Sequence, residues 1–136
     1  MDNIKQRKLL QEFINEPKHK GLTEEQRNNS FKSSVAACED IFFIHLEIEN
    51  NFVKQAKFSG AGCAVSAGSV EATLRIIEGK TKEQVTTILD KFEKLIDGEI
   101  KTTGVEELDV FSIVQSHVSR KKCARAPIEA IRKAIR

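Results

Sequence analysis

The sequence predicts an α+β fold in which one helix is followed by a small antiparallel sheet and then by several helices. Three features of the hydrophobic pattern predict it: a helical period near the N-terminus, a two-residue alternation over 41–49, and a return to the helical period from residue 63 onward. Strands that are grouped before the helices argue against a doubly wound parallel sheet. With 136 residues, we expect a single domain over 1–136, with an N-terminal helix and loop over 1–29 and an acidic insert over 97–109.

Helices are expected wherever apolar residues recur three or four positions apart. Thr81, followed three residues later by Gln84, forms a capping box that marks the start of one of these helices. The last helix is expected to begin only at about residue 126, because Pro127 biases the preceding residue away from helical geometry, and this leaves Cys123 in a loop. The helical stretches are 3–14, 63–78, 82–96, about 108–116 and about 126–136.

Three strands are expected between the first helix and the later ones. Over 41–49 apolar and polar residues alternate, which is typical of a half-buried strand. The two asparagines at 50–51 tolerate positive φ, so they predict a tight hairpin that returns as a strand over 52–58. A third, more weakly marked strand is expected over 31–37, and the polar stretch 15–29 before it is predicted to be a loop.

Composition limits the classes of function. The net charge of +2 is too close to neutral to indicate nucleic-acid binding, and the chain has eight Phe but no Tyr and no Trp on which RNA bases could stack. No apolar run approaches the ~20 residues that a membrane-spanning helix needs, and the N-terminus lacks the apolar core of a signal peptide. We therefore expect a cytoplasmic protein that binds neither nucleic acid nor a membrane.

Three cysteines carry most of the chemical information. An odd number without an export signal argues against a disulfide framework and leaves free thiols, a metal site or sulfur chemistry. Cys38 and Asp40 lie two positions apart at the head of a strand, so their side chains point to the same side. Cys63 follows a Gly-x-Gly sequence and opens a helix, where backbone N–H groups favour a thiolate. Cys123 follows three basic residues, which also favour a thiolate.

Each cysteine alone is compatible with an inert thiol. Because all three stand at the boundaries of predicted elements, their joint placement favours one shared metal or sulfur site. Other chemistry is less well supported. The sequence Gly79-Lys80-Thr81 lacks the earlier glycine of a phosphate-binding P-loop and follows a helix. The three histidines are scattered, and none stands at the spacing of a hydrolytic triad.

These cysteine motifs resemble those of the IscU/NifU N-terminal family of iron–sulfur cluster assembly proteins, and most closely those of its SufU branch. The resemblance covers about residues 9–136 and implies C-terminal helices packed on one face of the sheet. Lys122 stands where IscU proteins usually have His, and the acidic insert separates the second and third cysteines as in SufU-type proteins. The three matching motifs are Cys38-Glu39-Asp40, Gly60-Ala61-Gly62-Cys63 and Arg120-Lys121-Lys122-Cys123.

The resemblance implies a zinc-dependent sulfurtransferase. By motif position, Cys38, Asp40, Cys63 and Cys123 are the zinc ligands, and Cys38 accepts persulfide sulfur from a PLP-dependent cysteine desulfurase of the SufS or IscS type. A second implied function is a scaffold whose cysteines bind iron or a [2Fe–2S] cluster that passes to apo iron–sulfur proteins. A third hypothesis is a binding protein in which the zinc is purely structural and the basic segment 120–136 docks an acidic partner.

Overall fold

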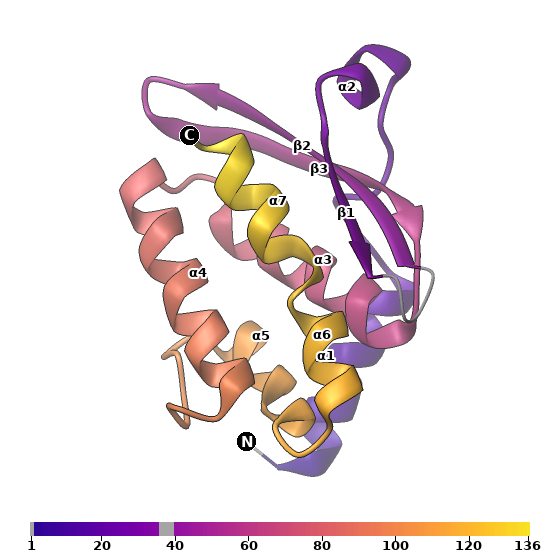
Figure 1. Cartoon of the computed structure of the whole chain (residues 1–136), viewed down its shortest axis with the longest axis vertical. Helices are drawn as coiled ribbons and strands as arrows, with labels where there is room; N and C mark the ends of the chain where they lie inside the picture. The colour runs from indigo at the N-terminus through magenta and orange to yellow at the C-terminus, as the bar shows by residue number, and fades with distance from the viewer. Residues whose placement is uncertain (1, 36–39) are drawn as a thin grey trace.

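The structure, a computed structural model, describes residues 2–35 and 40–136. A three-stranded sheet is covered on one face by α3 and α7, and α1, α4 and α6 pack around α3 (Figure 1). The predicted α+β order of helix, sheet and helices is confirmed. The elements are α1 (Asn3–Asn15), α2 (Glu24–Asn28), β1 (Phe31–Val35), β2 (Asp40–Glu49), β3 (Phe52–Ala61), α3 (Ala64–Ile77), α4 (Lys82–Asp97), α5 (Glu106–Asp109), the 3-10 helix η2 (Val110–Val114), α6 (Val118–Ala124) and α7 (Ala126–Ala134).

The sheet has the order β1-β2-β3, and both neighbouring pairs are antiparallel. Along β2, Phe42 and Ile44 are buried under the helices. Phe43 lies between them on the opposite face, where the Arg27 guanidinium carbon of α2 is 4.0 Å from the centroid of its ring. The alternation predicted from the sequence is therefore confirmed, and it places the core on one side of the sheet.

Turns and helix ends follow local signals in the sequence. Asn50 and Asn51 adopt φ values of 52° and 69°, so the predicted hairpin is confirmed. The side chain of Thr81 accepts a hydrogen bond from the backbone N–H of Gln84, and the Gln84 side chain accepts one from the backbone N–H of Thr81. This reciprocal pair confirms the predicted capping box at the start of α4. Gly98 ends α4 in the left-handed conformation, with φ of 82°.

A short helix, α2, interrupts the segment that the sequence predicts as a loop over 15–29. Thr23 and Gln26 form a second reciprocal capping box at its start. The prediction of a continuous loop is therefore wrong. Its sequence signal, Thr followed three residues later by Gln, is the same one that predicts α4.

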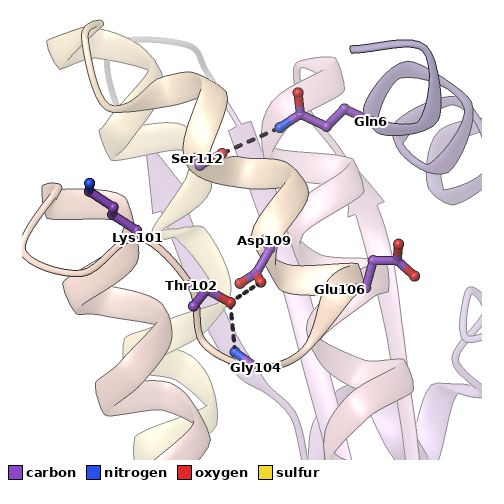
Figure 2. Close-up of a pocket in the computed structure, with 7 residues that line it drawn as sticks. All are labelled: Gln6, Lys101, Thr102, Gly104, Glu106, Asp109 and Ser112. Carbon is purple, nitrogen blue, oxygen red and sulfur yellow. Dashed lines mark hydrogen bonds between the residues drawn. The ribbon is translucent and has the colours of Figure 1, made fainter. Parts of the chain in front are cut away.

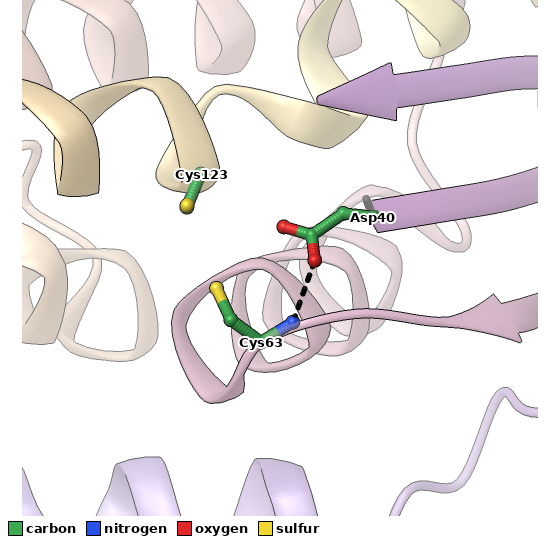
Figure 3. Close-up of side chains that lie close together, drawn as sticks. All are labelled: Asp40, Cys63 and Cys123. Atoms are coloured by element: carbon green, nitrogen blue, oxygen red, sulfur yellow. Dashed lines mark hydrogen bonds between the residues drawn. The ribbon is translucent and has the colours of Figure 1, made fainter. Parts of the chain in front are cut away.

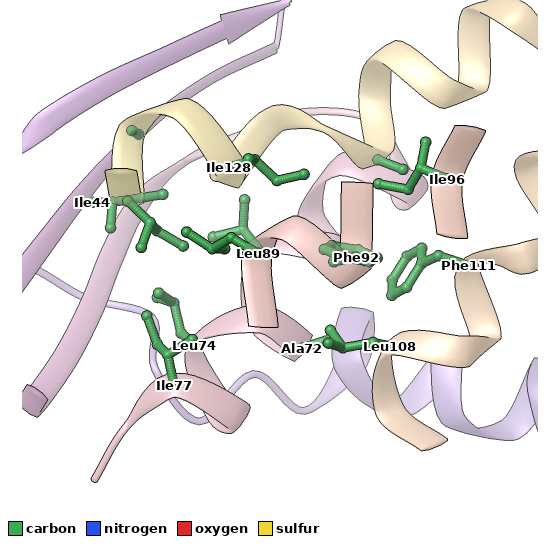
Figure 4. Close-up of a cluster of buried hydrophobic side chains, with 14 of the residues drawn as sticks. Ile44, Ala72, Leu74, Ile77, Leu89, Phe92, Ile96, Leu108, Phe111 and Ile128 are labelled. Atoms are coloured by element: carbon green, nitrogen blue, oxygen red, sulfur yellow. The ribbon is translucent and has the colours of Figure 1, made fainter. Parts of the chain in front are cut away.

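Helix α3 lies at the centre of the hydrophobic core, and most of its residues are buried. The core continues between α4 and η2, where the rings of Phe92 and Phe111 meet edge to face with centroids 5.7 Å apart (Figure 4). Each large apolar side chain that is fully buried contributes about 1.5–3 kcal/mol. In the described ranges, no helix combines the length and apolarity that crossing a membrane would require.

A buried carboxylate on α3 connects this helix to the segment before β1. Glu71 is fully buried and accepts hydrogen bonds from the His19 backbone N–H at 2.9 Å and from Arg75 Nε at 2.6 Å. Burial raises the pKa of Glu71, but the hydrogen bonds from Arg75 and His19 outweigh it, and the pKa lies below its usual value. Arg75 also pairs with Glu12 of α1 at 3.0 Å, and the Phe58 N–H of β3 donates to the His19 carbonyl at 2.9 Å. The network thus joins α1, α3 and β3.

The predicted acidic insert is partly helical, because α4 extends to Asp97 and α5 occupies Glu106–Asp109. Asp109 accepts hydrogen bonds from the Thr103 N–H at 2.8 Å and from Thr103 Oγ1 at 2.7 Å. Thr102 Oγ1 also donates to it, as Figure 2 shows. These contacts shape a polar pocket of about 400 Å³ that neither Cys63 nor Cys123 lines. Asp109 therefore holds residues 102–103 of the insert against α5.

Candidate metal centre

Three elements that are distant in the sequence meet at one end of the sheet. Asp40 is the first residue of β2, Cys63 is the N-cap of α3, and Cys123 lies in α6. One carboxylate oxygen and the two sulfurs all lie within 4.8 Å of one another (Figure 3). Cys38, the fourth residue predicted for this site, lies outside the described residues.

Asp40 is buried, with only 1% of its surface exposed. Its Oδ1 accepts a 2.8 Å hydrogen bond from the backbone N–H of Cys63. Its Oδ2 is buried and has no hydrogen-bond partner among the residues that the structure describes. An ionised carboxylate oxygen is costly to bury without a donor or a cation beside it. Oδ2 is therefore available as a ligand for a positive ion.

Cys63 holds its sulfur at the N-terminus of α3. The sulfur accepts a hydrogen bond from the Ser66 N–H at 3.4 Å and lies 3.5 Å from Ser66 Oγ. Burial raises the pKa of the Cys63 thiol, but hydrogen bonds from Ser66 and from Cys123 outweigh it, so the pKa lies below its usual value. The hydrogen bonds from Ser66 are contacts of the kind by which a helix N-terminus favours a thiolate at this position.

The Gly-x-Gly sequence before Cys63 is required by close packing within the chain. Gly60 has φ of 115°, and a Cβ there would lie 2.2 Å from the Ile41 carbonyl oxygen. A Cβ on Gly62 would lie 2.7 Å from Asp40 Cγ and 2.6 Å from Ser66 Oγ. Glycine therefore lets the end of β3 approach the Asp40 carboxylate closely enough for the Cys63 hydrogen bond to form.

Cys123 is fully buried in α6, so the prediction that it lies in a loop is wrong. Pro127 occupies the first turn of α7, where its missing N–H costs nothing, and a separate helix ends just before α7 at Ala124. Ser69 Oγ of α3 donates a 2.6 Å hydrogen bond to the Ala124 carbonyl. This bond holds the end of α6 against α3, which is the helix that Cys63 caps.

The donor set matches the preferences of zinc. Thiolate sulfur and carboxylate oxygen are both common ligands of Zn²⁺, with bonds of about 2.3 Å and about 2.0–2.2 Å. Ligand atoms around one such ion are about 4 Å apart. The observed separations, none of them above 4.8 Å, are within about 1 Å of that value. The same sulfurs also suit iron, because thiolate sites take either metal according to supply.

The other candidates from the sequence have structural roles. Gly79, with φ of 86°, forms the turn after α3, and Thr81 caps α4, so this segment is not arranged as a phosphate site. His19 contacts Glu71, and His45 Nδ1 lies 3.3 Å from the exposed Asn29 carbonyl. Sequence reasoning missed Glu71, although a glutamate four residues before Arg75, in a helix stretch with no other charged residue, was a readable signal.

The sequence model of the NifU-like N terminal domain family matches residues 5–135. The chain belongs to this family. The assignment made from the three cysteine motifs is confirmed.

Named relatives represent two branches of the family. The chain is 28% identical over 101 residues to the iron–sulfur cluster assembly scaffold protein IscU of Thermotoga maritima, which covers 74% of this chain and 71% of that protein. It is 23% identical over 133 residues to the zinc-dependent sulfurtransferase SufU of Bacillus subtilis, which covers 95% of this chain and 88% of that protein.

The fold is also similar to solved structures. A crystal structure from Fervidobacterium islandicum, described as an iron–sulfur cluster assembly scaffold protein for the SUF system, superposes with a TM-score of 0.85 at 21% identity. The superposition covers 94% of each chain. At this identity the similarity establishes the fold alone.

Proposed function

We propose that this chain is an iron–sulfur cluster assembly protein that binds zinc through Cys38, Asp40, Cys63 and Cys123 and accepts sulfur from a PLP-dependent cysteine desulfurase. The observation that carries the proposal is the buried Asp40 Oδ2, which lacks a hydrogen-bond partner among the described residues and is directed to the side on which the two sulfurs lie (Figure 3). Such a donor set is incomplete without a cation. The names of the two relatives support the same assignment.

Residues of the chain position the ligand atoms and favour the thiolate form of Cys63. Asp40 Oδ1 accepts the Cys63 N–H, and its other oxygen faces the side on which the sulfurs lie (Figure 3). Ser66 donates hydrogen bonds that favour the Cys63 thiolate. When bound, zinc would keep the thiols deprotonated and protect them from oxidation.

Cys38 is the proposed sulfur acceptor, and its position in the sequence supports this role. It precedes Asp40 by two residues, so an extended chain directs both side chains to one side. In the transfer, the Cys38 thiolate attacks the terminal sulfur of the persulfide on the desulfurase cysteine. A new sulfur–sulfur bond forms on Cys38, the old one breaks, and the desulfurase cysteine leaves as a thiolate.

Sulfur transfer to this chain can be measured directly. The zinc-loaded protein is incubated with its cognate cysteine desulfurase and cysteine, and alanine release and the mass of the chain are followed. We expect faster alanine release and one added sulfur atom on the wild-type chain, and no added sulfur on Cys38→Ser. Zinc-loaded protein that neither accelerates the desulfurase nor gains sulfur would contradict the proposal.

The second candidate function is a scaffold for a [2Fe–2S] cluster that passes to apo iron–sulfur proteins. The specific observation in its favour is the 28% identity to a relative named as a scaffold. Anaerobic reconstitution with iron and sulfide would then give thiolate-to-iron charge-transfer absorbance. Transfer of an intact cluster to an apo-ferredoxin, without stimulation of a desulfurase, would favour this function over the first.

A further inference from the structure

A charged groove runs between β1 and the two C-terminal helices. It has a volume of about 350 Å³. Of the described residues that line it, four are basic and one is acidic: Lys32, Lys122, Arg125, Lys133 and Glu129. Lys32 belongs to β1, Lys122 to α6 and Lys133 to α7, so both walls of the groove carry positive charge.

Ion pairs inside the chain account for two of these five charges. Arg125 pairs with Asp97 at the end of α4, and Glu129 pairs with Arg132 at 2.8 Å. Within the described residues, no ion pair forms at Lys32, Lys122 or Lys133. Among its described lining residues, the groove therefore presents three ammonium groups without an ion pair, and the one carboxylate, that of Glu129, is already neutralised.

The groove lies next to the candidate metal centre. Lys122 directly precedes Cys123, and Val35 at the end of β1 pairs with Asp40 in the sheet register. Ser33 Oγ donates a hydrogen bond to the Ala126 carbonyl, which joins β1 to the start of α7. Figure 1 shows β1 running down toward the junction of α6 and α7. A segment bound in the groove would thus approach the cysteines from the α6 side.

We propose that this groove docks an acidic segment of the partner protein that exchanges sulfur or a cluster with the metal centre. Charge complementarity carries the inference, because three unpaired ammonium groups favour carboxylates and speed the encounter of oppositely charged surfaces. Because the groove lies next to the metal centre, a partner segment that docks there would be close to the residues that exchange sulfur or a cluster. The inference rests on the proposed function only for the identity of the partner.

A protein segment fits the groove better than a nucleic acid does. No aromatic side chain is among the described residues that line the groove, so these residues offer bases no surface on which to stack. Arginine, which binds phosphate through two parallel hydrogen bonds, is represented only by Arg125, and that side chain is paired with Asp97. Lysine ammonium groups, acting as point charges, have no such geometric preference and suit flexible carboxylate side chains.

The binding test uses the whole chain and two defined probes. An isotope-labelled sample is titrated with a synthetic ten-residue glutamate peptide and, separately, with a single-stranded oligonucleotide, and backbone amide shifts are followed by NMR. We expect the peptide to shift the amides of Lys32, Ser34, Lys122 and Lys133, with binding that weakens as salt is raised. Peptide-induced shifts confined to other surfaces, or tighter binding of the oligonucleotide in the groove, would overturn the inference.

The functional test compares two charge-matched double variants. Lys32→Glu/Lys133→Glu changes both walls of the groove without touching a proposed ligand, and Lys8→Glu/Lys91→Glu changes exposed lysines of α1 and α4. Each pair of reversals lowers the formal net charge from +2 by four, to −2. With the desulfurase, we expect the groove variant to raise the KM for this chain about tenfold with kcat unchanged, and the control and Lys32→Arg/Lys133→Arg to behave as wild type.

The outcomes separate this inference from the proposed function. Equal KM changes in both charge-reversed variants would show only a long-range charge effect and would overturn the docking site. If the wild-type chain does not stimulate the desulfurase, the proposed function fails. The peptide titration then still decides whether the groove binds acidic segments.

Discussion

The Asp40 carboxylate and the backbone N–H of Cys63 are joined by a 2.8 Å hydrogen bond. This bond fixes the first residue of β2 to the residue that caps α3. One ligand oxygen and one ligand sulfur are therefore positioned by the fold itself. The other oxygen of Asp40 is buried and directed to the side of the sulfurs, where it can bind an ion.

Two substitutions of Asp40 separate its structural role from its charge. In zinc-free protein, Asp40→Asn should be at least as stable as wild type, because the amide oxygen still accepts the Cys63 N–H and a buried charge is removed. Asp40→Ala should lose about 1–3 kcal/mol, because that N–H loses its acceptor. Urea unfolding in the presence of a chelator measures both, and equal losses in the two variants would contradict the assigned roles. Zinc affinity should fall in both.

Gly62→Ala should displace the Asp40 carboxylate. The new Cβ would lie 2.7 Å from Asp40 Cγ, and overpacking of this kind costs about 1–3 kcal/mol. We expect lower thermal stability and substoichiometric zinc by metal analysis. Gly104→Ala is the control, because its Cβ meets no atom within 4 Å although φ is 82°. It should cost some stability and leave the zinc content unchanged; loss of zinc in both variants would indicate a nonspecific effect.

Ser69→Ala should weaken the site from a distance. Ser69 Oγ donates to the Ala124 carbonyl at 2.6 Å, and that carbonyl lies at the end of α6, beyond its intrahelical partners. Removing the donor should cost about 1–3 kcal/mol. It should also weaken zinc binding about tenfold, because α6 carries Cys123. Competition with a chromogenic chelator measures the affinity. Thr86→Ala, which removes an exposed hydroxyl on α4, should change neither quantity.

Glu71 should make the stability depend on pH in the acid range. Its pKa in the folded chain is lowered, so its contribution is fully present above the usual glutamate pKa of about 4.3 and is lost as the pH falls through the folded-state value. Glu71→Gln should cost about 3 kcal/mol at pH 7, because Arg75 then loses a charged partner. The difference from wild type should shrink below about pH 4.

Chelator-treated samples, unfolded with urea at a series of pH values, test this dependence without interference from metal release. Glu99→Gln serves as the control, since Glu99 is exposed and its side chain makes no hydrogen bond to a described residue. It should change stability by less than about 0.5 kcal/mol. A Glu71→Gln difference that stays constant from pH 7 to pH 3 would refute the role assigned to this carboxylate.

Local signals predicted most of the fold. The alternation along β2, the asparagine hairpin at 50–51 and the capping box at Thr81 are each decided by a few neighbouring residues, and each is confirmed. Helix α2 was equally readable and was missed. The break between α6 and α7 was not readable, because Pro127 is compatible both with a loop before it and with a second helix that ends at Ala124.

The candidate site was predictable in composition but not in geometry. The sequence motifs predict Asp40, Cys63 and Cys123 as ligands, and the structure brings these three residues together. The hydrogen bond that uses one oxygen of Asp40, and the reason Gly62 must lack a side chain, depend on how β3 passes the start of β2. Such contacts join residues far apart in the chain, and no local pattern encodes them. Cys38 stays a prediction.

The zinc content of the purified chain tests the central claim most directly. Native mass spectrometry with elemental analysis should find one zinc per wild-type chain, and single substitutions Cys38→Ser, Asp40→Ala, Cys63→Ser and Cys123→Ser should each lower the affinity for it. A wild-type chain that binds no metal at stoichiometric level, or a zinc content that survives both Cys63→Ser and Cys123→Ser, would contradict the account.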